Sequence, residues 1–115
     1  YNDFLAKYNV SVLNHYDSIN TSSGHLYFVR FNGKDSNYRN EFITKMAELG
    51  IGTNVHYKPL PMFTAYKQLG FDISDFPNAY NLYKNEMTLP LHTCLTDEDV
   101  DYVLNCFAKV YEEME

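Results

Sequence analysis

The sequence contains no tryptophan and only two cysteines, Cys94 and Cys106. The cysteines have neither C-x-x-C spacing nor a companion histidine at zinc-finger spacing, so the pattern indicates neither a zinc site nor a redox pair. Disulfides are rare in the cytoplasm, and unpaired cysteine behaves as a small buried hydrophobe. We therefore expect both cysteines to be reduced thiols in the core of a cytoplasmic protein.

Basic residues are also scarce, because 9 Lys and Arg stand against 15 Asp and Glu and give a net charge of -6. They form no cluster that could follow a phosphate backbone, which argues against a nucleic-acid partner. No apolar run approaches the roughly 20 residues of a membrane span, and the first residues lack the layout of a signal peptide. The sequence therefore predicts neither a nucleic-acid nor a membrane partner.

Most catalytic motifs are missing. There is no G-x-S-x-G, H-E-x-x-H or phosphate-binding G-x-x-x-x-G-K-[ST] pattern. The stretch GIGTNV has two glycines of a dinucleotide-binding pattern but Val55 in place of the third, and it follows a predicted helix instead of a strand. No two of the four histidines are three or four residues apart, so the sequence predicts no metal site.

The chain has the length of a single domain, with 115 residues of which 45% are hydrophobic. Its 11 tyrosines and 8 phenylalanines are numerous. Tyrosine buries its ring while its hydroxyl stays wet, so we expect some tyrosines to line a surface that another part covers. Three others, Tyr66, Tyr80 and Tyr83, occupy helical positions and are predicted to belong to the core or its rim. His15 and His25 flank a loop and are predicted to be exposed.

Apolar periodicity and capping residues predict the elements along the chain. They are a short helix that frays into a loop within residues 1–16, a loop at 17–24, a strand at 25–31, a helix at 37–50 capped by Asp35 or Ser36, a strand at 53–57, helical turns at 62–70, a helix at 75–87 with Pro77 in its first turn, an edge strand at 88–91, and a last helix after a capping box of Thr96 and Asp99. This order predicts an α+β fold with a small antiparallel or mixed sheet of about three short strands and helices packed on one face.

The segment GIGTNVHYKPLP, residues 50–61, is the strongest candidate for a binding site. A lone histidine in a strand is ordinarily a half-buried, hydrogen-bonded side chain, and His56 fits that interpretation. Its setting favours a second one. His56 and Tyr57 would point to opposite faces of a strand, and the proline-bounded loop that follows would hold Lys58 close by as part of a rigid wall. The residues alone leave both interpretations open.

Two segments, ELGIGTNVHYKPLPMF and FPNAYNLYKNEMTLPLHTCLTDEDVDYVLNCF, resemble the C-terminal part of the DegT/DnrJ/EryC1/StrS family of sugar aminotransferases, which depend on pyridoxal phosphate. Four ordered blocks carry the resemblance from about residue 25 to residue 112. Thr88 stands where the family usually has serine. The matching residues are Gly50, Ile51, His56, Tyr57, Pro59 and Leu60, then Phe76, Pro77 and Ala79, then Leu89, Pro90 and Leu91, and finally Leu95, Thr96, Glu98 and Val100.

The resemblance implies the small C-terminal domain of a fold-type I aminotransferase over residues 25–115, with residues 1–24 as a helix and linker leading into it. The family's cofactor lysine lies in a large domain that this sequence does not resemble. We therefore expect a fragment that binds no cofactor alone and has no catalytic residue, an expectation that a first residue other than Met also favours. In the full-length enzyme the resemblance implies pyridoxal 5'-phosphate, glutamate and a sugar nucleotide as ligands, and a homodimer.

Within this resemblance His56, Tyr57 and Lys58 are the expected substrate-binding residues. Two alternatives stay open. The parent enzyme could be a sugar dehydratase of the same family, in which a histidine replaces the cofactor lysine. The chain could also be a free-standing ligand-binding or dimerisation module with a similar α+β shape. The sugar, its nucleotide and the aminated position are not indicated by these residues.

Overall fold

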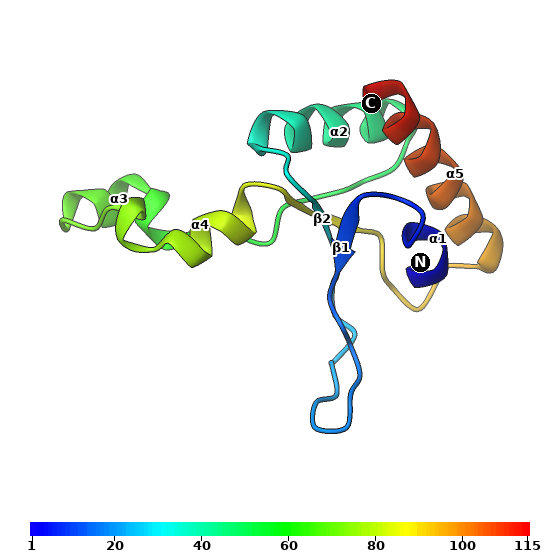
Figure 1. The fold of residues 1–115 in the computed structure, drawn as a ribbon, viewed down its shortest axis with the longest axis horizontal. Helices are drawn as coiled ribbons and strands as arrows, with labels where there is room; N and C mark the ends of the chain where they lie inside the picture. The colour runs from blue at the N-terminus through cyan, green and yellow to red at the C-terminus, as the bar shows by residue number, and fades with distance from the viewer.

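A three-stranded antiparallel sheet in the order β1-β2-β3 organises the chain in the computed structural model, which describes residues 1–115 (Figure 1). The elements in chain order are α1 (Asn2–Leu5), β1 (Val10–Val12), β2 (Tyr27–Phe31), α2 (Ser36–Glu48), η1 (Leu60–Met62), α3 (Thr64–Gln68), η2 (Ile73–Asp75), α4 (Pro77–Tyr83), β3 (Glu86–Leu89) and α5 (Asp97–Met114). This is the α+β architecture that the sequence predicts, with β3 at one edge of the sheet.

The central strand, β2, shows the alternation expected of a strand with one face on the core. Tyr27, Val29 and Phe31 are buried, and the two residues between them are half-buried. Val29 lies opposite Met87 of β3. β3 differs from β2 because all four of its residues are buried, so both faces of this short edge strand are covered.

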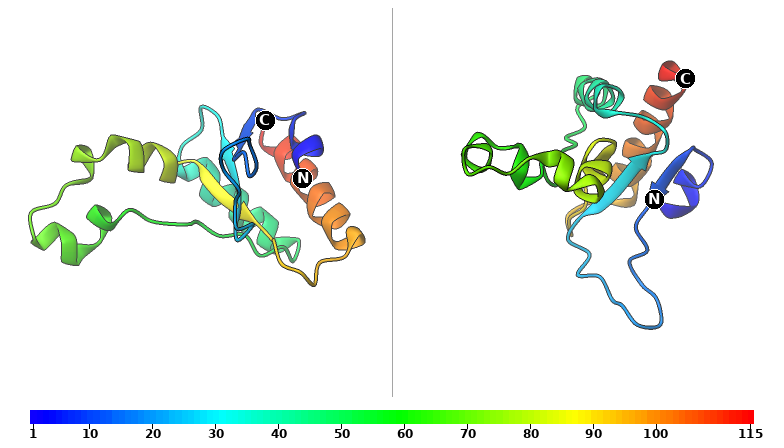
Figure 2. Two further views of the ribbon diagram at one scale, coloured as in Figure 1. Left: turned by 90° about the horizontal axis from the view of Figure 1, so that it is seen from below. Right: turned by 60° about the vertical axis from the view of Figure 1, so that its left-hand side comes forward.

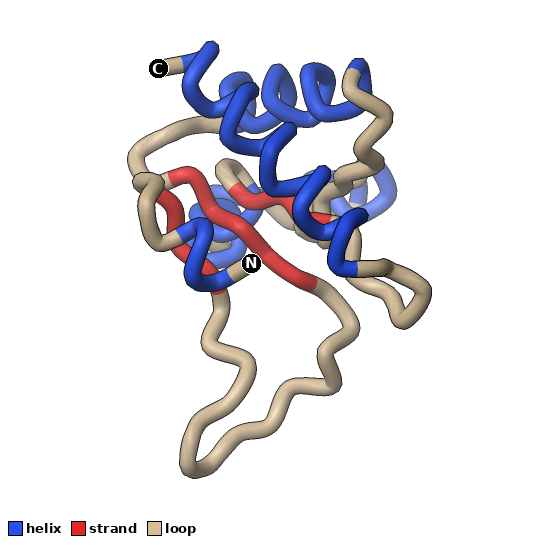
Figure 3. Tube along the Cα trace, turned by 90° about the vertical axis from the view of Figure 1, so that its right-hand side faces the viewer, coloured by secondary structure: helices blue, strands red, loops and turns tan.

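Helices α2 and α5 pack against each other on one side of the sheet (Figure 3). Their contact is built on aromatic side chains. The ring centroid of Phe42 in α2 lies 4.7 Å from that of Phe31 and 5.0 Å from that of Phe107 in α5. All three side chains are buried, and apolar area removed from water in this way is the main stabilising contribution to a domain of this size.

Both long helices begin where the sequence predicts. The Asp35 carboxylate accepts from the backbone N–H groups of Asn37 and Tyr38, so Asp35 caps α2. Thr96 and Asp99 form the expected reciprocal capping box at the start of α5. The predicted helix with Pro77 in its first turn is α4, although it ends at Tyr83.

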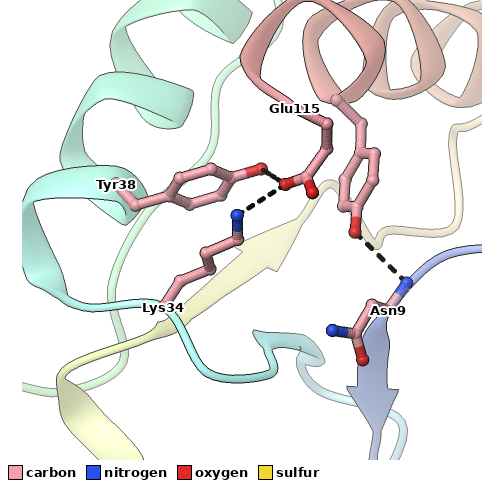
Figure 4. Close-up of polar contacts among 5 residues, drawn as sticks. Asn9, Lys34, Tyr38 and Glu115 are labelled. Carbon is pink, nitrogen blue, oxygen red and sulfur yellow. Dashed lines mark hydrogen bonds and ion pairs between the residues drawn. The ribbon is translucent and has the colours of Figure 1, made fainter.

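The C-terminal end of α5 is joined to two other elements (Figure 4). The Glu115 carboxylate lies 2.7 Å from Lys34 Nζ and accepts a hydrogen bond of 3.2 Å from the Tyr38 hydroxyl. One turn earlier the Tyr111 hydroxyl accepts from the Asn9 backbone N–H, also at 3.2 Å. These contacts connect the last turn of α5 to the start of α2 and to the residue before β1.

Residues 57–84, which we call the arm, project away from the sheet as a chain of short helices (Figures 1 and 2). None of its four helical segments, η1, α3, η2 and α4, contains a buried residue. Leu69 is 74% exposed. Large apolar side chains are exposed along its length, namely Tyr57, Leu60, Phe63, Tyr66, Leu69, Phe71, Phe76, Tyr80 and Leu82.

A second excursion, residues 13–26, hangs below the sheet between β1 and β2 (Figure 1). A single bridge joins Tyr16 to Thr21, and Ile19 near its tip is 89% exposed. His15 is half-buried instead of exposed as predicted, because its ring stacks on Tyr27 at a centroid distance of 5.7 Å. His25 is exposed, as the sequence predicts.

Several element predictions are wrong. Residues 53–57 form no strand, since only Asn54 makes a bridge, to Thr88. β1 lies where a fraying helix is predicted, because its pairing with β2 outweighs the local pattern. Met87 belongs to β3 instead of the helix before it.

The predicted burial of certain side chains is also wrong. Cys94 is exposed, whereas Cys106 is buried as expected, and both thiols are free. Tyr66 and Tyr80 are exposed on the arm, and only Tyr83 is half-buried. Tyr66 and Tyr80 are exposed because they lie in α3 and α4 of the arm, which contain no buried residue. No helix combines enough length with enough apolar character to cross a membrane.

Candidate functional site

His56 lies where the chain leaves the edge of the sheet and enters the arm. Residues 51–56 run beside β3, and the bridge from Asn54 to Thr88 fixes their position. The backbone N–H of Thr88 donates to the Asn54 carbonyl at 2.8 Å. The peptide bond between His56 and Tyr57 is cis. The two rings meet edge to face with centroids 4.7 Å apart, so His56 and Tyr57 are neighbours in space and do not point to opposite faces of a strand.

The structure separates the three predicted site residues by exposure. His56 is half-buried, Tyr57 is 69% exposed and Lys58 is exposed. The Lys58 ammonium lies 5.1 Å from the centroid of the Phe63 ring, in a cation–π arrangement on the arm. The structure therefore brings His56 and Tyr57 together and turns Lys58 toward the arm.

Two residues of β3 that are not among the predicted site residues hold His56 in place. The His56 backbone N–H donates to Glu86 Oε1 at 2.9 Å. Its ring Nδ1 lies 2.9 Å from Thr88 Oγ1. Because side chains alternate along a strand, Glu86 and Thr88 share the face of β3 that is opposite to Met87 and Leu89. The backbone and the ring of His56 are thus both held by one strand face.

Glu86, the first residue of β3, is an unusual glutamate because it is 0% exposed. Oε2 is buried and has no hydrogen-bond partner. Burial raises the pKa of this carboxyl to about 7, although the His56 N–H and the charges of Arg39 and Arg30 act in the opposite direction. Near neutral pH the site therefore contains a carboxyl that can gain or lose a proton.

Arg39 supports the same strand from α2. Its side chain is buried, and Nη1 donates to the backbone carbonyls of Tyr83 and Glu86, both at 3.1 Å. The guanidinium also lies 4.9 Å from the centroid of the Tyr83 ring. Arg39 thereby connects the end of α4 to the start of β3 at the point where the arm returns to the sheet.

His56 stands between two hollows. The first has a volume of about 370 Å³, and its lining includes His25, Thr53, Asn54 and Thr88. The second has a volume of about 150 Å³ and is lined by His56, Tyr57, Pro59, Ala79, Leu82, Tyr83 and Glu86. Neither lining includes a lysine. The arrangement offers an imidazole, hydroxyl groups and aromatic edges to a ligand, which are binding groups for a polar molecule with a ring.

One sequence signal could have identified Glu86. The segment EMTL places a charged residue in a short run that is otherwise apolar or β-branched. In a strand with one solvated face such a glutamate is unremarkable, but every residue of β3 is buried. The assignment of residues 84–87 to a helix concealed this signal.

The family model of the DegT/DnrJ/EryC1/StrS aminotransferase family matches residues 1–108. The chain is 42% identical over 83 residues to the spore coat polysaccharide biosynthesis protein SpsC of Bacillus subtilis, an alignment that covers 70% of this chain and 21% of that protein. It is 32% identical over 93 residues to the UDP-4-amino-4,6-dideoxy-N-acetyl-beta-L-altrosamine transaminase of Campylobacter jejuni, with coverage of 81% and 24%.

Solved structures show the same likeness. The putative sugar aminotransferase Spr1654 from Streptococcus pneumoniae, in its PMP-form, superposes with a TM-score of 0.94 at 46% identity, over 99% of this chain and 29% of that one. Its PLP-form superposes equally well. In these comparisons the chain spans less than a third of the length of the proteins that it matches.

Proposed function

Since the chain belongs to the DegT/DnrJ/EryC1/StrS aminotransferase family, we propose that it is the small C-terminal domain of a sugar-nucleotide aminotransferase that depends on pyridoxal phosphate. The enzyme would move an amino group from glutamate to a keto-sugar carried on a nucleotide. The observation that carries this proposal is the likeness of nearly the whole chain to a solved sugar aminotransferase. The division of the chain at residue 25 stays a prediction, as do the cytoplasmic location and the full-length homodimer.

We assign substrate binding to the region of His56. The His56 imidazole and the Tyr57 hydroxyl suit the polar groups of a sugar, and the Lys58 ammonium suits the charge of a diphosphate. Tyr57 and Lys58 are exposed, so both can reach a ligand that lies over the start of the arm. None of the three is assigned as a catalytic base.

The residues beside His56 do not fit a pyridoxal phosphate site. The cofactor's aldehyde requires a lysine amine, and neither hollow has one. Lys58, the lysine next in sequence, directs its ammonium to Phe63. We therefore propose that the cofactor is held by a part of the enzyme outside these residues, and we assign no reaction step to this chain.

Steady-state kinetics of the full-length enzyme test the assignment. The His56→Ala variant is expected to raise KM for the sugar nucleotide about tenfold, because a hydrogen bond to substrate is worth about 1 kcal/mol or somewhat more. Cofactor absorbance should be unchanged. His92 is exposed and outside both linings, so His92→Ala is the matched control. An unchanged KM in the His56 variant would contradict the assignment.

A further inference from the structure

The Thr88 hydroxyl lies between two partners, and it has a single proton for them. Oγ1 is 2.9 Å from His56 Nδ1 and 3.3 Å from the Asn54 carbonyl oxygen. A hydroxyl donates one hydrogen bond and accepts up to two, whereas a carbonyl only accepts. The contact with Asn54 is therefore a hydrogen bond only if Thr88 donates it.

This proton count decides which ring nitrogen of His56 carries the hydrogen. If Thr88 donates to Asn54, then Nδ1–H donates to Thr88 Oγ1 and both contacts are hydrogen bonds. If Thr88 instead donates to Nδ1, its oxygen faces the Asn54 oxygen with no proton between them. The buried Thr88 hydroxyl makes two hydrogen bonds in the first arrangement and only one in the second, where its oxygen also faces the Asn54 oxygen, so the first arrangement is favoured.

The opposite ring nitrogen is then an acceptor. Nε2 makes no hydrogen bond within the chain and is not among the buried polar atoms that lack a partner. The His56 side chain contributes to the lining of both hollows. Glu86 accepts a hydrogen bond from the His56 backbone N–H, and Thr88 contacts ring Nδ1. These two contacts fix the residue and its ring and leave Nε2 free to bind a ligand.

We propose that the pair of hydrogen bonds from His56 to Thr88 and from Thr88 to Asn54 fixes His56 as the Nδ1–H tautomer. Nε2 then selects a ligand group that donates a hydrogen bond, a hydroxyl or an amine, and disfavours a group that only accepts. This inference rests on the proposed function in one respect, namely that the ligand at His56 is the sugar nucleotide. The tautomer itself does not depend on that function.

Position 88 allows a matched pair of substitutions. Serine keeps the hydroxyl that bonds to both His56 and Asn54. Valine has the shape of threonine without the hydroxyl, so it removes both hydrogen bonds with little change in volume. Serine and valine are therefore matched substitutions at one buried position.

Nitrogen-15 NMR of the histidine rings in this 115-residue chain tests the tautomer directly. Spectra are recorded at alkaline pH, where the imidazole is neutral. The expected result is the Nδ1–H form of His56 in the wild type and in Thr88→Ser, and a mixture of both tautomers in Thr88→Val. A wild-type ring protonated on Nε2, or a Thr88→Val ring that keeps the Nδ1–H form alone, would overturn the inference.

Substrate affinity separates this inference from the proposed function. The probes are a nucleoside-diphosphate hexose and its singly deoxygenated analogues, measured with the full-length enzyme. Removal of one hydroxyl of the hexose is expected to weaken binding about tenfold in the wild type and in Thr88→Ser, and much less in Thr88→Val. If the Nδ1–H form is observed but no hydroxyl depends on Thr88, the selection of a donor group is refuted while the tautomer stands. If the sugar nucleotide does not bind near His56 at all, the assignment of substrate binding to His56 fails, while the tautomer stands.

Discussion

The His56 backbone N–H donates to the Glu86 carboxylate across 30 residues of sequence, at 2.9 Å. This hydrogen bond holds the two ends of the arm together, because His56 precedes the arm and Glu86 follows it. It also joins the candidate site to the one carboxyl that is buried in β3. The stability of the chain and the geometry of the site therefore depend on the same side chain.

The first prediction concerns the pH dependence of stability. The pKa of Glu86 rises from its ordinary 4.5 to about 7 in the folded chain. Between these values the folded state keeps a proton that the unfolded state has lost, so stability falls as pH rises through this window. At about 1.4 kcal/mol per pKa unit, the loss is of the order of 3 kcal/mol.

Urea unfolding of the wild type and of Glu86→Gln across this pH window measures the effect. The Gln variant keeps an acceptor for the His56 N–H but cannot ionise, so its pH profile is expected to lack this loss. Glu48 is exposed on α2, and Glu48→Gln should follow the wild-type profile. Parallel profiles for the wild type and Glu86→Gln would show that Glu86 titrates normally.

The second prediction concerns Arg39. The Arg39→Ala variant removes a charged donor from the carbonyls of Tyr83 and Glu86, and buried acceptors left without partners are costly. We expect a loss of about 3 kcal/mol in the free energy of unfolding. Lys45 forms a surface ion pair at 3.8 Å with Glu113, so Lys45→Ala should cost less than about 1 kcal/mol. Equal losses in the two variants would contradict the assigned role of Arg39.

The third prediction concerns the start of α5. Thr96→Ala removes the side-chain acceptor for the Asp99 N–H and should destabilise the chain by about 1 kcal/mol. Thr44 offers the same chemical change in the exposed interior of α2, where its hydroxyl bonds only to the Asn40 carbonyl. Thr44→Ala should be neutral or slightly stabilising, because alanine is the better helix former. Thermal unfolding followed by circular dichroism distinguishes the two variants.

The fourth prediction contrasts the arm with the core. Leu69 is 74% exposed, whereas Phe107 is 0% exposed. Leu69→Ser should change the free energy of unfolding by less than about 0.5 kcal/mol. Phe107→Ala should cost about 3 to 5 kcal/mol through lost burial and the cavity left behind. A Leu69 variant as destabilised as the Phe107 variant would mean that the arm packs against its own chain.

The sequence predicted the elements whose signals are local. Asp35 and the pair of Thr96 and Asp99 fix the starts of α2 and α5 through contacts within four residues. β1 and residues 53–57 were assigned wrongly because their conformations depend on partners distant in sequence, namely β2 and Thr88. Local patterns carry little information about such pairing.

The candidate site likewise combines residues that a local motif predicts with residues that are distant in sequence. His56 and Tyr57 are predicted site residues because their block resembles a family motif, whereas Glu86 and Thr88 support His56 from 30 and 32 residues away. Spacing along the chain gave no reason to connect them. The pocket-lining role of His56, Tyr57 and Lys58 stays a prediction.

The hydrogen bond that joins the two ends of the arm has a consequence for how the length and sequence of the arm can vary. The two ends of a 28-residue excursion, residues 57–84, are adjacent in space, and its helices bury no residue. Chain between two fixed, neighbouring points can change in length at a modest entropic cost. The cluster of buried apolar residues contains no residue of the arm, so we expect excursions of other lengths and sequences to be tolerated at this junction if they keep the carbonyl that Arg39 binds at Tyr83.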